Sequence, residues 1–134
     1  MDDTLIRRVM PNSAETEKAV IGCILMDKDK MTDVADILVP DDFYHSEYRA
    51  IYQAMVQINA EGRPVDLVTV IERLKTMNVP PELCSLEFMK EVADSEATAA
   101  NAKHYAKIIK EKSLLRRVIK AVSYTHLTLP TKLE

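Results

Sequence analysis

The chain has 134 residues, which is enough for one domain with a single hydrophobic core and too few for two enzymatic domains. With 47% hydrophobic and 29% charged residues, its composition is that of a globular protein rather than a disordered or membrane chain. Its two glycines, Gly22 and Gly62, lie far apart, so a glycine-rich phosphate loop, which needs two glycines within about six residues, is excluded.

Charge is distributed unevenly along the chain, although the net charge is only −3. Residues 1–100 contain 10 basic and 19 acidic residues, whereas residues 101–122 contain seven basic residues and a single acidic one, Glu111. An acidic body followed by a basic segment is typical of a protein that docks onto a charged partner or onto another copy of itself.

Cysteine use and hydropathy indicate the compartment. Cys23 and Cys84 form no CxxC pair and no Cys/His cluster, so we expect no structural zinc site and a reducing environment. The longest uncharged apolar run is far shorter than the ~18 residues that span a bilayer, and the N-terminus lacks a signal-peptide pattern. These features predict a cytoplasmic protein without a membrane partner.

The first two predicted helices precede a proline. Asn12 is a suitable N-cap, with Glu15 three positions later to bond back to it as in a capping box. Apolar residues over 20–25 then form the buried stripe of the first helix. A second, short helix carries apolar residues over 31–38, and Pro40 terminates it because a proline disfavours helical backbone in the residue before it.

Two further helices are predicted in the middle of the chain. Ser46 caps the third helix, and Gly62 ends it as a C′ residue. Asp66 caps the fourth, whose apolar residues over 67–74 repeat with helical spacing. The β-branched run 65–71 could instead form a strand, but it lacks alternation and a partner run, so we favour a helix.

The last two predicted helices follow the proline pair at 80–81. Ser85 opens the fifth helix, whose apolar residues fall within 88–92. The sixth and longest helix covers 101–122, and its apolar stripe runs to the end without a cap. The periodicity therefore predicts an all-α fold, a small orthogonal bundle of about six helices.

The composition changes abruptly after Val122, to SYTHLTLPTKLE. This threonine-rich stretch lacks helical periodicity and resembles vector or adaptor read-through, so we expect residues 123–134 to be a non-native tail. The alternative is a genuine extended tail. If the tail is foreign, the helix that ends at Val122 needs a packing partner that this chain does not supply.

No catalytic constellation is recognisable. Asp41, Asp42 and His45 could hold a divalent metal, but a polar turn that caps the next helix is the favoured interpretation. His104 lies between two lysines and is expected on a solvated helix face. Because neither a nucleophile with its base nor a cofactor loop is present, we expect no catalytic residue, metal or cofactor here.

The basic residues of the last helix have two interpretations. They could neutralise nucleic-acid phosphates, with Arg116, Arg117 and Lys120 as contacts, which would make the chain a small helical nucleic-acid-binding domain. They could instead form the solvated face of an interface helix that meets an acidic neighbour. We favour the interface, because aromatic stacking partners are few and the domain is acidic overall.

Four stretches in a fixed order together carry a family resemblance. They resemble the N-terminal domain of DnaB-type bacterial replicative DNA helicases over about residues 5 to 122. The stretches are PNSAETEKAVIGCIL at 11–25, VPDDFYHSEYRAIYQAM at 39–55, GRPVDLVTVIERL at 62–74 and AANAKHYAKIIKEKSLLRRVIKA at 99–121.

The resemblance implies a collar domain of a hexameric ring. In that family the domains pair through a helical hairpin, assemble as a trimer of dimers, and dock primase and helicase loaders. A RecA-like motor domain elsewhere in the parent chain binds ATP and Mg²⁺ and separates the DNA strands, with single-stranded DNA held in the parent assembly. The fragment itself is then not an enzyme, and its function is assembly and docking.

The resemblance also implies a division of the chain and roles for particular residues. It implies an N-terminal arm at 1–10, a globular helical subdomain at 11–100, and the first arm of a truncated hairpin at 101–122. Candidate primase contacts are Glu15, Phe88 (usually Tyr in the family) and Ile119, with capping, core packing and hairpin packing as the structural alternatives. Candidate hairpin or dimer contacts are Tyr105, Ile108, Ile109 and Leu115.

Overall fold

A computed structural model describes residues 12–95 and 98–133, and no strand occurs in this part of the chain. Six α-helices and two short 3₁₀ helices account for most of it, so the predicted all-α fold is confirmed. The elements are α2 (Ala14–Met26), α3 (Lys30–Ala35), η1 (Pro40–Asp42), α4 (Ser46–Ala60), α5 (Leu67–Thr76), η2 (Pro81–Cys84), α6 (Leu86–Ala93) and α7 (Ala102–Leu133).

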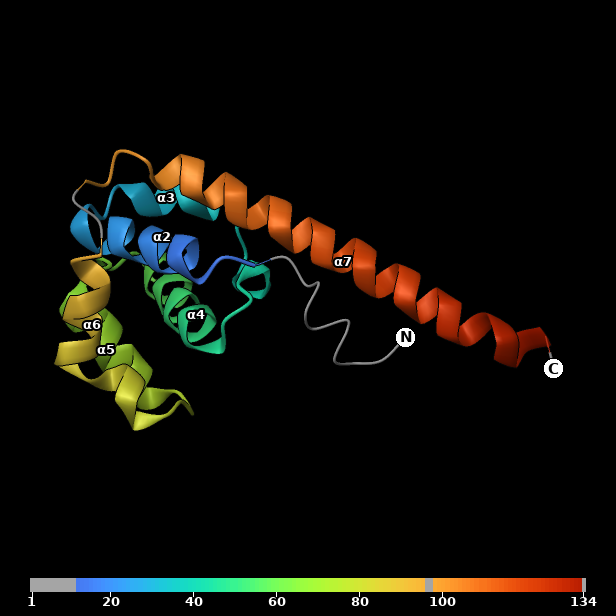
Figure 1. Cartoon of the computed structure of the whole chain (residues 1–134). Coiled ribbons are helices and arrows are strands. Elements are labelled where there is room, and N and C mark those ends of the chain that lie inside the picture. Colours follow the sequence, from blue (N-terminus) through green and yellow to red (C-terminus); the bar gives the residue numbers. More distant parts are fainter. Residues whose placement is uncertain (1–11, 96–97, 134) are drawn as a thin grey trace.

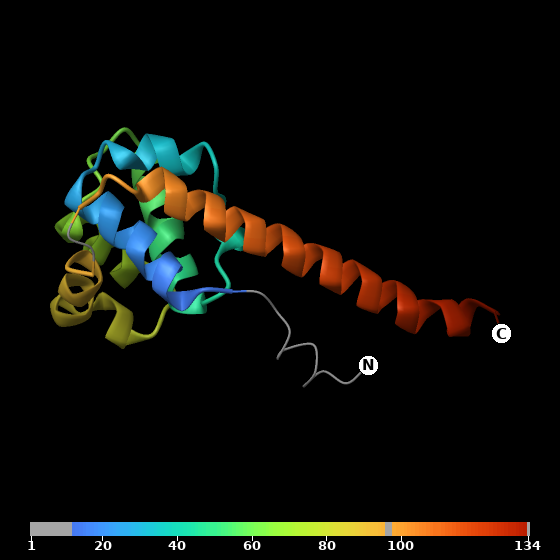
Figure 2. The same ribbon diagram turned by 45° about the horizontal axis from the view of Figure 1, so that its top comes forward.

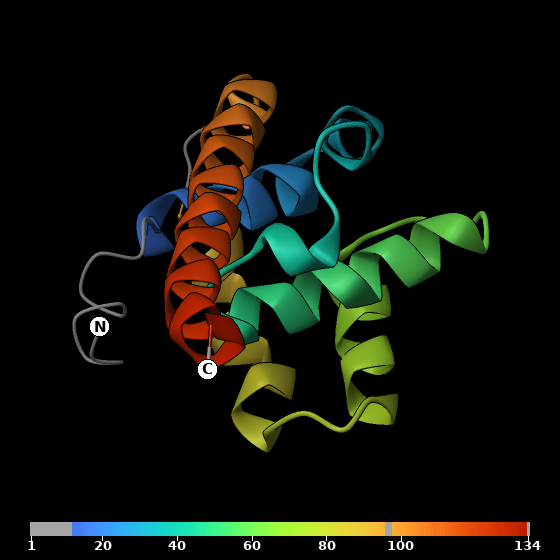
Figure 3. The same cartoon turned by 90° about the vertical axis from the view of Figure 1, so that its right-hand side faces the viewer.

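Helices α2 to α6 pack into a body, and α7 projects from it as a long rod (Figure 1). The start of α7 lies on the body against α2, α3 and η1. Its C-terminal part extends well past every other helix (Figure 2). Viewed from the end of the rod, α4 runs across the direction of α7, so the helices cross rather than lie parallel (Figure 3).

Helix α2 begins one residue later than predicted. Ser13, not Asn12, is the N-cap, and its Oγ accepts a hydrogen bond from the backbone N–H of Thr16 at 3.2 Å. The hydroxyls of Ser13 and Thr16 also lie 2.7 Å apart. The predicted capping role of Glu15 is therefore wrong, since the third residue after the true cap is Thr16, and the side chain of Glu15 is exposed.

The turns around Pro40 and His45 differ slightly from expectation. Helix α3 ends at Ala35, and Pro40 begins the 3₁₀ helix η1 instead of ending a longer helix. Proline suits the first turn of a helix because its missing N–H would have no partner there. His45 is the N-cap of α4, and Ser46, predicted as the cap, is the first helical residue.

The predicted end of α4 and the predicted start of α5 are confirmed. Gly62 has a φ of +74°, which is the left-handed conformation that glycine adopts most readily. The N–H of Gly62 donates to the carbonyl of Asn59, and that of Arg63 to Ile58, which is a Schellman motif. Asp66 caps α5 reciprocally with Thr69, so this segment is a helix and not a strand.

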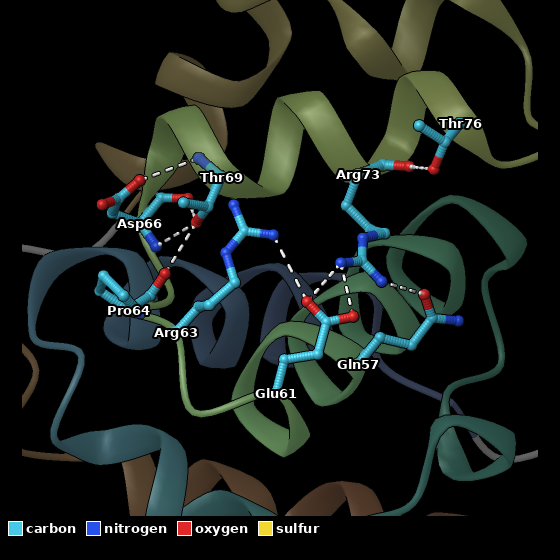
Figure 4. Close-up of polar contacts among 8 residues, drawn as sticks. All are labelled: Gln57, Glu61, Arg63, Pro64, Asp66, Thr69, Arg73 and Thr76. Carbon is cyan, nitrogen blue, oxygen red and sulfur yellow. Dashed lines mark hydrogen bonds and ion pairs between the residues drawn. The ribbon is translucent and has the colours of Figure 1, made fainter.

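Polar side chains join α4 to α5 on the surface (Figure 4). Both carboxylate oxygens of Glu61, at the end of α4, accept hydrogen bonds from Nη2 of Arg73, at 2.6 and 2.7 Å. Arg73 also donates to Gln57 at 3.2 Å, and Arg63 donates to Glu61 at 3.4 Å. These bonds hold the pKa of Glu61 below its usual value, chiefly through the hydrogen bond from Arg73. The pair joins the end of α4 to α5 at an exposed edge, where ion pairs contribute little to stability.

The core centres on Tyr52 of α4. Its ring lies 4.8 Å from that of Phe43, centroid to centroid, and both side chains are fully buried. The hydroxyl of Tyr52 donates to the carbonyl of Leu38 at 2.9 Å, which satisfies the one polar atom of this buried side chain. Burial raises the pKa of that hydroxyl well above its ordinary value. The contact ties α4 to the turn that follows α3.

Gly22 marks a close approach between α2 and α6. A Cβ added there would lie 2.7 Å from the carbonyl oxygen of Val92 and 2.7 Å from Oγ of Ser95. Although alanine is favoured over glycine in a helix by roughly 1 kcal/mol, the backbone carbonyl cannot move aside cheaply. We expect Gly22→Ala to lower the free energy of unfolding by about 1–3 kcal/mol, measured by urea denaturation. An unchanged or higher urea midpoint would show that the two helices can separate at little cost.

Helix α7 continues to Leu133, past Val122, where the change in composition predicted the helix to end. No glycine or proline occurs between Val122 and Leu129, so no strong helix-breaking residue directly follows the predicted end of the helix at Val122. None of the described helices, α7 included, is long and apolar enough to cross a membrane.

Candidate docking surfaces and the anchor of α7

A buried carboxylate holds α7 on the body. Asp42 of η1 is fully buried, and its Oδ1 accepts hydrogen bonds from the hydroxyl of Ser113 at 2.7 Å and from Arg117 at 3.2 Å. Its Oδ2 accepts from the backbone N–H of Val39 at 2.9 Å and from Nζ of Lys110 at 3.2 Å. One side chain therefore bonds three successive turns of α7, which fixes the direction in which the helix leaves the body.

The pKa of Asp42 reflects this setting. Burial favours the protonated form and raises the pKa of the carboxyl group. The hydrogen bonds from Val39 and Ser113, and the bond to and charge of Lys110, outweigh that effect and hold the pKa below its usual 3.8. Asp42 is thus a carboxylate that stays charged because α7 is bonded to it.

A second buried carboxylate orders the chain after η1. Glu17 of α2 is 1% exposed, and its two oxygens accept hydrogen bonds from the backbone N–H of Tyr44 at 2.9 Å and of His45 at 3.1 Å. Nδ1 of His45 lies 3.1 Å from Oε1 of the same carboxylate. Glu17 therefore holds the start of α4 against α2.

The predicted alternatives for residues 41 to 45 were a metal site and a polar turn. Asp42 bonds Lys110 of α7, whereas His45 contacts Glu17 of α2, so the two potential ligands have different partners. No group of three His, Cys, Asp or Glu side chains suited to a metal occurs among the residues that the structure describes. The favoured interpretation of a polar turn preceding α4 fits the geometry, although it did not include the burial of Asp42.

The apolar stripe predicted for the last helix coincides only in part with the side of α7 that is buried against the body. Ile109, a candidate for contacts with a second arm, is 2% exposed and packs in the core of this chain. The inward side of α7 consists of residues spaced by three and four, and it includes small and charged side chains as well as Ile109. Its buried members are Ala102, Ala106, Ile109, Ser113 and Arg116.

The other candidates for hairpin contacts lie at or beyond the edge of this inward side. Tyr105 is half-buried and packs against the core, and Ile108 is half-buried. Leu115 is 46% exposed. Together with its neighbours it forms an exposed apolar face on the outward side of α7. We call it the arm stripe, and it consists of Leu114, Leu115, Val118 and Val122.

Two of the three candidate primase contacts lie on adjacent helices. Glu15 is exposed on α2, and Phe88 is half-buried on α6, which packs against α2. Tyr48 of α4 has a pKa raised first by burial and then by the negative charges of Glu47, Glu91, Glu17 and Glu15. Carboxylates therefore cluster near this phenol, although Glu17 is buried and Glu91 pairs with Lys18 at 3.3 Å. Ile119, the third candidate, is half-buried on α7 instead.

Phe88 also lines a groove of about 540 Å³ next to this cluster of carboxylates. The groove lies between the start of α4 and the segment that leads through η2 into α6. Its apolar lining comes from Ala50, Val79, Pro80, Leu83 and Phe88, and its rim carries Glu47 and Glu82. The arrangement suits an apolar side chain flanked by basic residues. We call Glu15, Tyr48 and this groove the acidic face.

The candidate phosphate contacts converge on the inward side of α7 just past Ser113. Arg116 is 6% exposed, its Nη2 donates to the carbonyl of Asp42 at 2.7 Å, and its guanidinium lies 5.2 Å from the ring centre of Tyr44. Arg117 shares the carboxylate of Asp42, and Lys120 is exposed. Arg117 thus pairs with Asp42 of the same chain, and the predicted pairing of the basic helix with an acidic neighbour stays a prediction.

Sequence reasoning missed Arg49. Its Nε donates to the carbonyl of Phe43 at 3.1 Å and its Nη2 to that of Tyr44 at 3.2 Å, so α4 contributes a guanidinium beside those of α7. The sequence offered one pattern that could have pointed to Arg49, an arginine in the first turn of a predicted helix that follows two aspartates and an aromatic residue. That pattern is too common to identify a site.

The fold and these surfaces define an all-α domain whose last helix is anchored on a buried carboxylate and projects an apolar face. The family model for the DnaB-like helicase N-terminal domain matches residues 9–111. A structure of the N-terminal domain of DnaB helicase from Mycobacterium tuberculosis is 31% identical and superposes with a TM-score of 0.88, covering 93% of this chain and 89% of that one. The chain belongs to the family of DnaB-like helicase N-terminal domains, which confirms the resemblance seen in the sequence.

Further relatives extend the comparison. The replicative DNA helicase DnaC of Bacillus subtilis (strain 168) is 40% identical and the replicative DNA helicase DnaB of Geobacillus stearothermophilus is 37% identical. Each match covers 92% of this chain and 27% of the relative, so the chain spans about a quarter of the length of these proteins. The N-terminal domain of DnaB helicase from Helicobacter pylori, solved in a study of its interactions with primase, shares the fold at a TM-score of 0.72 and 18% identity, covering 96% of this chain and 98% of that one.

Proposed function

We propose that this chain is the non-catalytic assembly and docking domain of a replicative helicase. The observation that carries this proposal is the arm stripe, an apolar face on the side of α7 that is turned away from the body. The relatives are helicases, and this chain corresponds to about a quarter of them. ATP, Mg²⁺ and strand separation would belong to the rest of the parent protein, which would enclose single-stranded DNA in its ring.

Self-association is the first part of the proposal. Three or more aliphatic side chains on a single exposed helix face are typical of a surface that another helix covers. Leu115 and Val118 lie three residues apart and Val122 follows four residues later, so they form one continuous ridge. The ridge would pack against the arm of a second copy and build pairs of domains, and pairs would build the hexamer of the parent.

Docking of primase or a helicase loader is the second part. The acidic face offers an apolar groove rimmed by Glu47 and Glu82 and an exposed carboxylate at Glu15. A partner that inserts an apolar side chain between basic residues would match both features. The study of the H. pylori domain concerns its interactions with primase, which makes the C-terminal domain of a primase the first partner to test.

Titration with a primase C-terminal domain tests this docking. We expect Phe88→Ala to weaken binding roughly 10- to 100-fold, because a half-buried aromatic side chain on a groove wall contributes about 1–3 kcal/mol when a partner covers it. Isothermal titration calorimetry gives the dissociation constants. Phe88→Tyr, which introduces the residue usual in the family, is the matched control and should bind as the unchanged chain does.

Structural effects of the change can be separated from loss of contact. Phe88 packs against the core, so the urea midpoint of Phe88→Ala must be measured beside its affinity. Glu15→Gln removes only an exposed charge and is expected to weaken binding about two- to fivefold, more at low salt. A primase domain that binds the unchanged chain and both variants equally well would remove the acidic face from the proposal.

A further inference from the structure

A pocket of about 330 Å³ lies between η1, the first turn of α4 and the inward side of α7, and its walls are mostly cationic. Figure 3 shows how these three elements meet where α7 leaves the body. Three guanidinium groups and one ammonium group line it, together with one hydroxyl and one exposed carboxylate. The lining residues are Asp41, Arg49, Ser113, Arg116, Arg117 and Lys120.

Two of the guanidinium groups are held in place by neutral oxygen atoms. Arg49 donates to the carbonyls of Phe43 and Tyr44, and Arg116 donates to the carbonyl of Asp42. Because carbonyl oxygens carry no net charge, these bonds orient the two side chains while leaving each guanidinium protonated. Burial lowers the pKa of Arg116, and Glu17 and Asp42 act against this. The positive charge of Arg49 adds a smaller lowering effect, so Arg49 and Arg116 are like charges close enough to repel one another.

The carboxylates nearby do not balance the cations. Asp42 accepts from both Lys110 and Arg117, so one negative charge is shared between two positive ones. Glu17 and Asp42 both act favourably on Arg116. Among the residues that the structure describes, five cations and three carboxylates therefore lie around this site. The cations are Lys110, Arg49, Arg116, Arg117 and Lys120, and the carboxylates are Glu17, Asp41 and Asp42.

We propose that this pocket binds a phosphate group, carried either by a strand of single-stranded DNA or by a small phosphorylated molecule. Guanidinium groups present paired N–H donors that match the oxygens of a phosphate, and the volume admits one such group with part of its ester. A bound phosphate would relieve the repulsion between Arg49 and Arg116. Neither primase docking nor pairing of the arms is required for this binding.

Binding to the whole chain tests the proposal with two probes, a fluorescein-labelled oligothymidylate followed by fluorescence anisotropy and inorganic pyrophosphate followed by NMR. We expect both probes to shift the side-chain N–H signals of Arg49 and Arg116. We expect Arg117→Ala with Lys120→Ala to weaken binding roughly tenfold or more, as for the loss of charge-assisted hydrogen bonds. Lys120→Ala alone leaves the bonds to Asp42 intact and should weaken binding without changing the urea midpoint.

Matched controls separate a pocket from general attraction. Lys103→Ala with Lys107→Ala removes the same charge from exposed positions on the same helix and should change the affinity less than about threefold. Asp41→Asn removes the exposed carboxylate from the lining and is expected to tighten binding about two- to fivefold. Competition between the probes distinguishes the sources. If pyrophosphate displaces the strand, the strand uses the pocket, and if only pyrophosphate binds there, the ligand is a small phosphorylated molecule.

Three results would overturn the proposal. The first is an equal loss of affinity in the pocket variant and the lysine control, which would mean diffuse attraction. The second is the absence of any shift in the arginine side-chain signals at millimolar pyrophosphate. The third is an acidic peptide, polyglutamate of matched charge, that binds the pocket more tightly than either phosphate probe, which would assign it to carboxylates.

Discussion

Replacing Asp42 with asparagine is expected to lower the free energy of unfolding by about 3–5 kcal/mol, the usual cost of removing one partner from a buried charged network. The carboxylate is fully buried and accepts hydrogen bonds from Lys110, Ser113 and Arg117. An asparagine amide has one acceptor oxygen and presents N–H donors to these groups, which are themselves donors. Urea unfolding followed by circular dichroism at 222 nm measures the loss.

The adjacent residue supplies the control. Asp41 is exposed, so Asp41→Asn removes the same charge from the same turn and should change the free energy of unfolding by less than about 0.5 kcal/mol. Hydrogen exchange adds a local readout, because amides of α7 near Ser113 should exchange faster in Asp42→Asn. If the two variants have equal stability, α7 is held by its apolar contacts and Asp42 is not its anchor.

The same carboxylate predicts how stability depends on pH. The pKa of Asp42 lies below its usual 3.8 in the folded chain, so the folded state binds the proton less readily than the unfolded state does. Its contribution is therefore complete above about pH 4 and is lost as the pH falls through the lower, folded-state pKa. We expect the unchanged chain to lose stability more steeply below pH 4 than Asp42→Asn, measured by urea midpoints from pH 6 to pH 2. Parallel curves would contradict this assignment.

Local signals in the sequence were sufficient for most of the fold. Helical spacing, the caps at Asp66 and Ser85, and the glycine after α4 each act within a few residues, so a single sequence carries them. Asn12 is not the cap because Ser13 next to it caps a helix equally well. Thr16 lies three residues after Ser13 and donates its backbone N–H to the Ser13 hydroxyl. Such competition between neighbours shifts a boundary by one residue without changing the fold.

The anchor could not be predicted in the same way. Asp42 bonds residues 68 to 75 positions later in the chain, and no local pattern marks which polar turn a distant helix will cover. The predicted apolar stripe did not match the inward side of α7 for a related reason. It contains alanines, a serine and an arginine, so an apolar stripe drawn through Ile109 and Leu115 joined one buried residue to one exposed residue. Charged residues can line the inward side of a helix when a buried carboxylate meets them.

Self-association is expected to depend strongly on the arm stripe. If two copies pair through α7, Leu115→Asp with Val118→Asp is expected to raise the dissociation constant of the dimer at least about 100-fold. Fully burying one aliphatic side chain contributes about 1.5–3 kcal/mol, and a symmetric interface contains each side chain twice. These residues are 46% and 59% exposed, so the change should leave the urea midpoint of the separate chain nearly unaltered. Light scattering coupled to size-exclusion chromatography, over a range of concentrations, measures the effect.

Two exposed aliphatic residues of the body provide a matched control. Leu86 on α6 is 52% exposed and Val68 on α5 is 64% exposed, so Leu86→Asp with Val68→Asp adds the same charges to the same residue types away from α7. This control should pair as the unchanged chain does, because the arm stripe lies on α7 whereas Leu86 and Val68 do not. Loss of pairing in both double variants would indicate general charge repulsion. A chain that stays monomeric at high concentration would mean that the arm stripe packs against a segment outside this sequence, and pairing through α7 alone would be wrong.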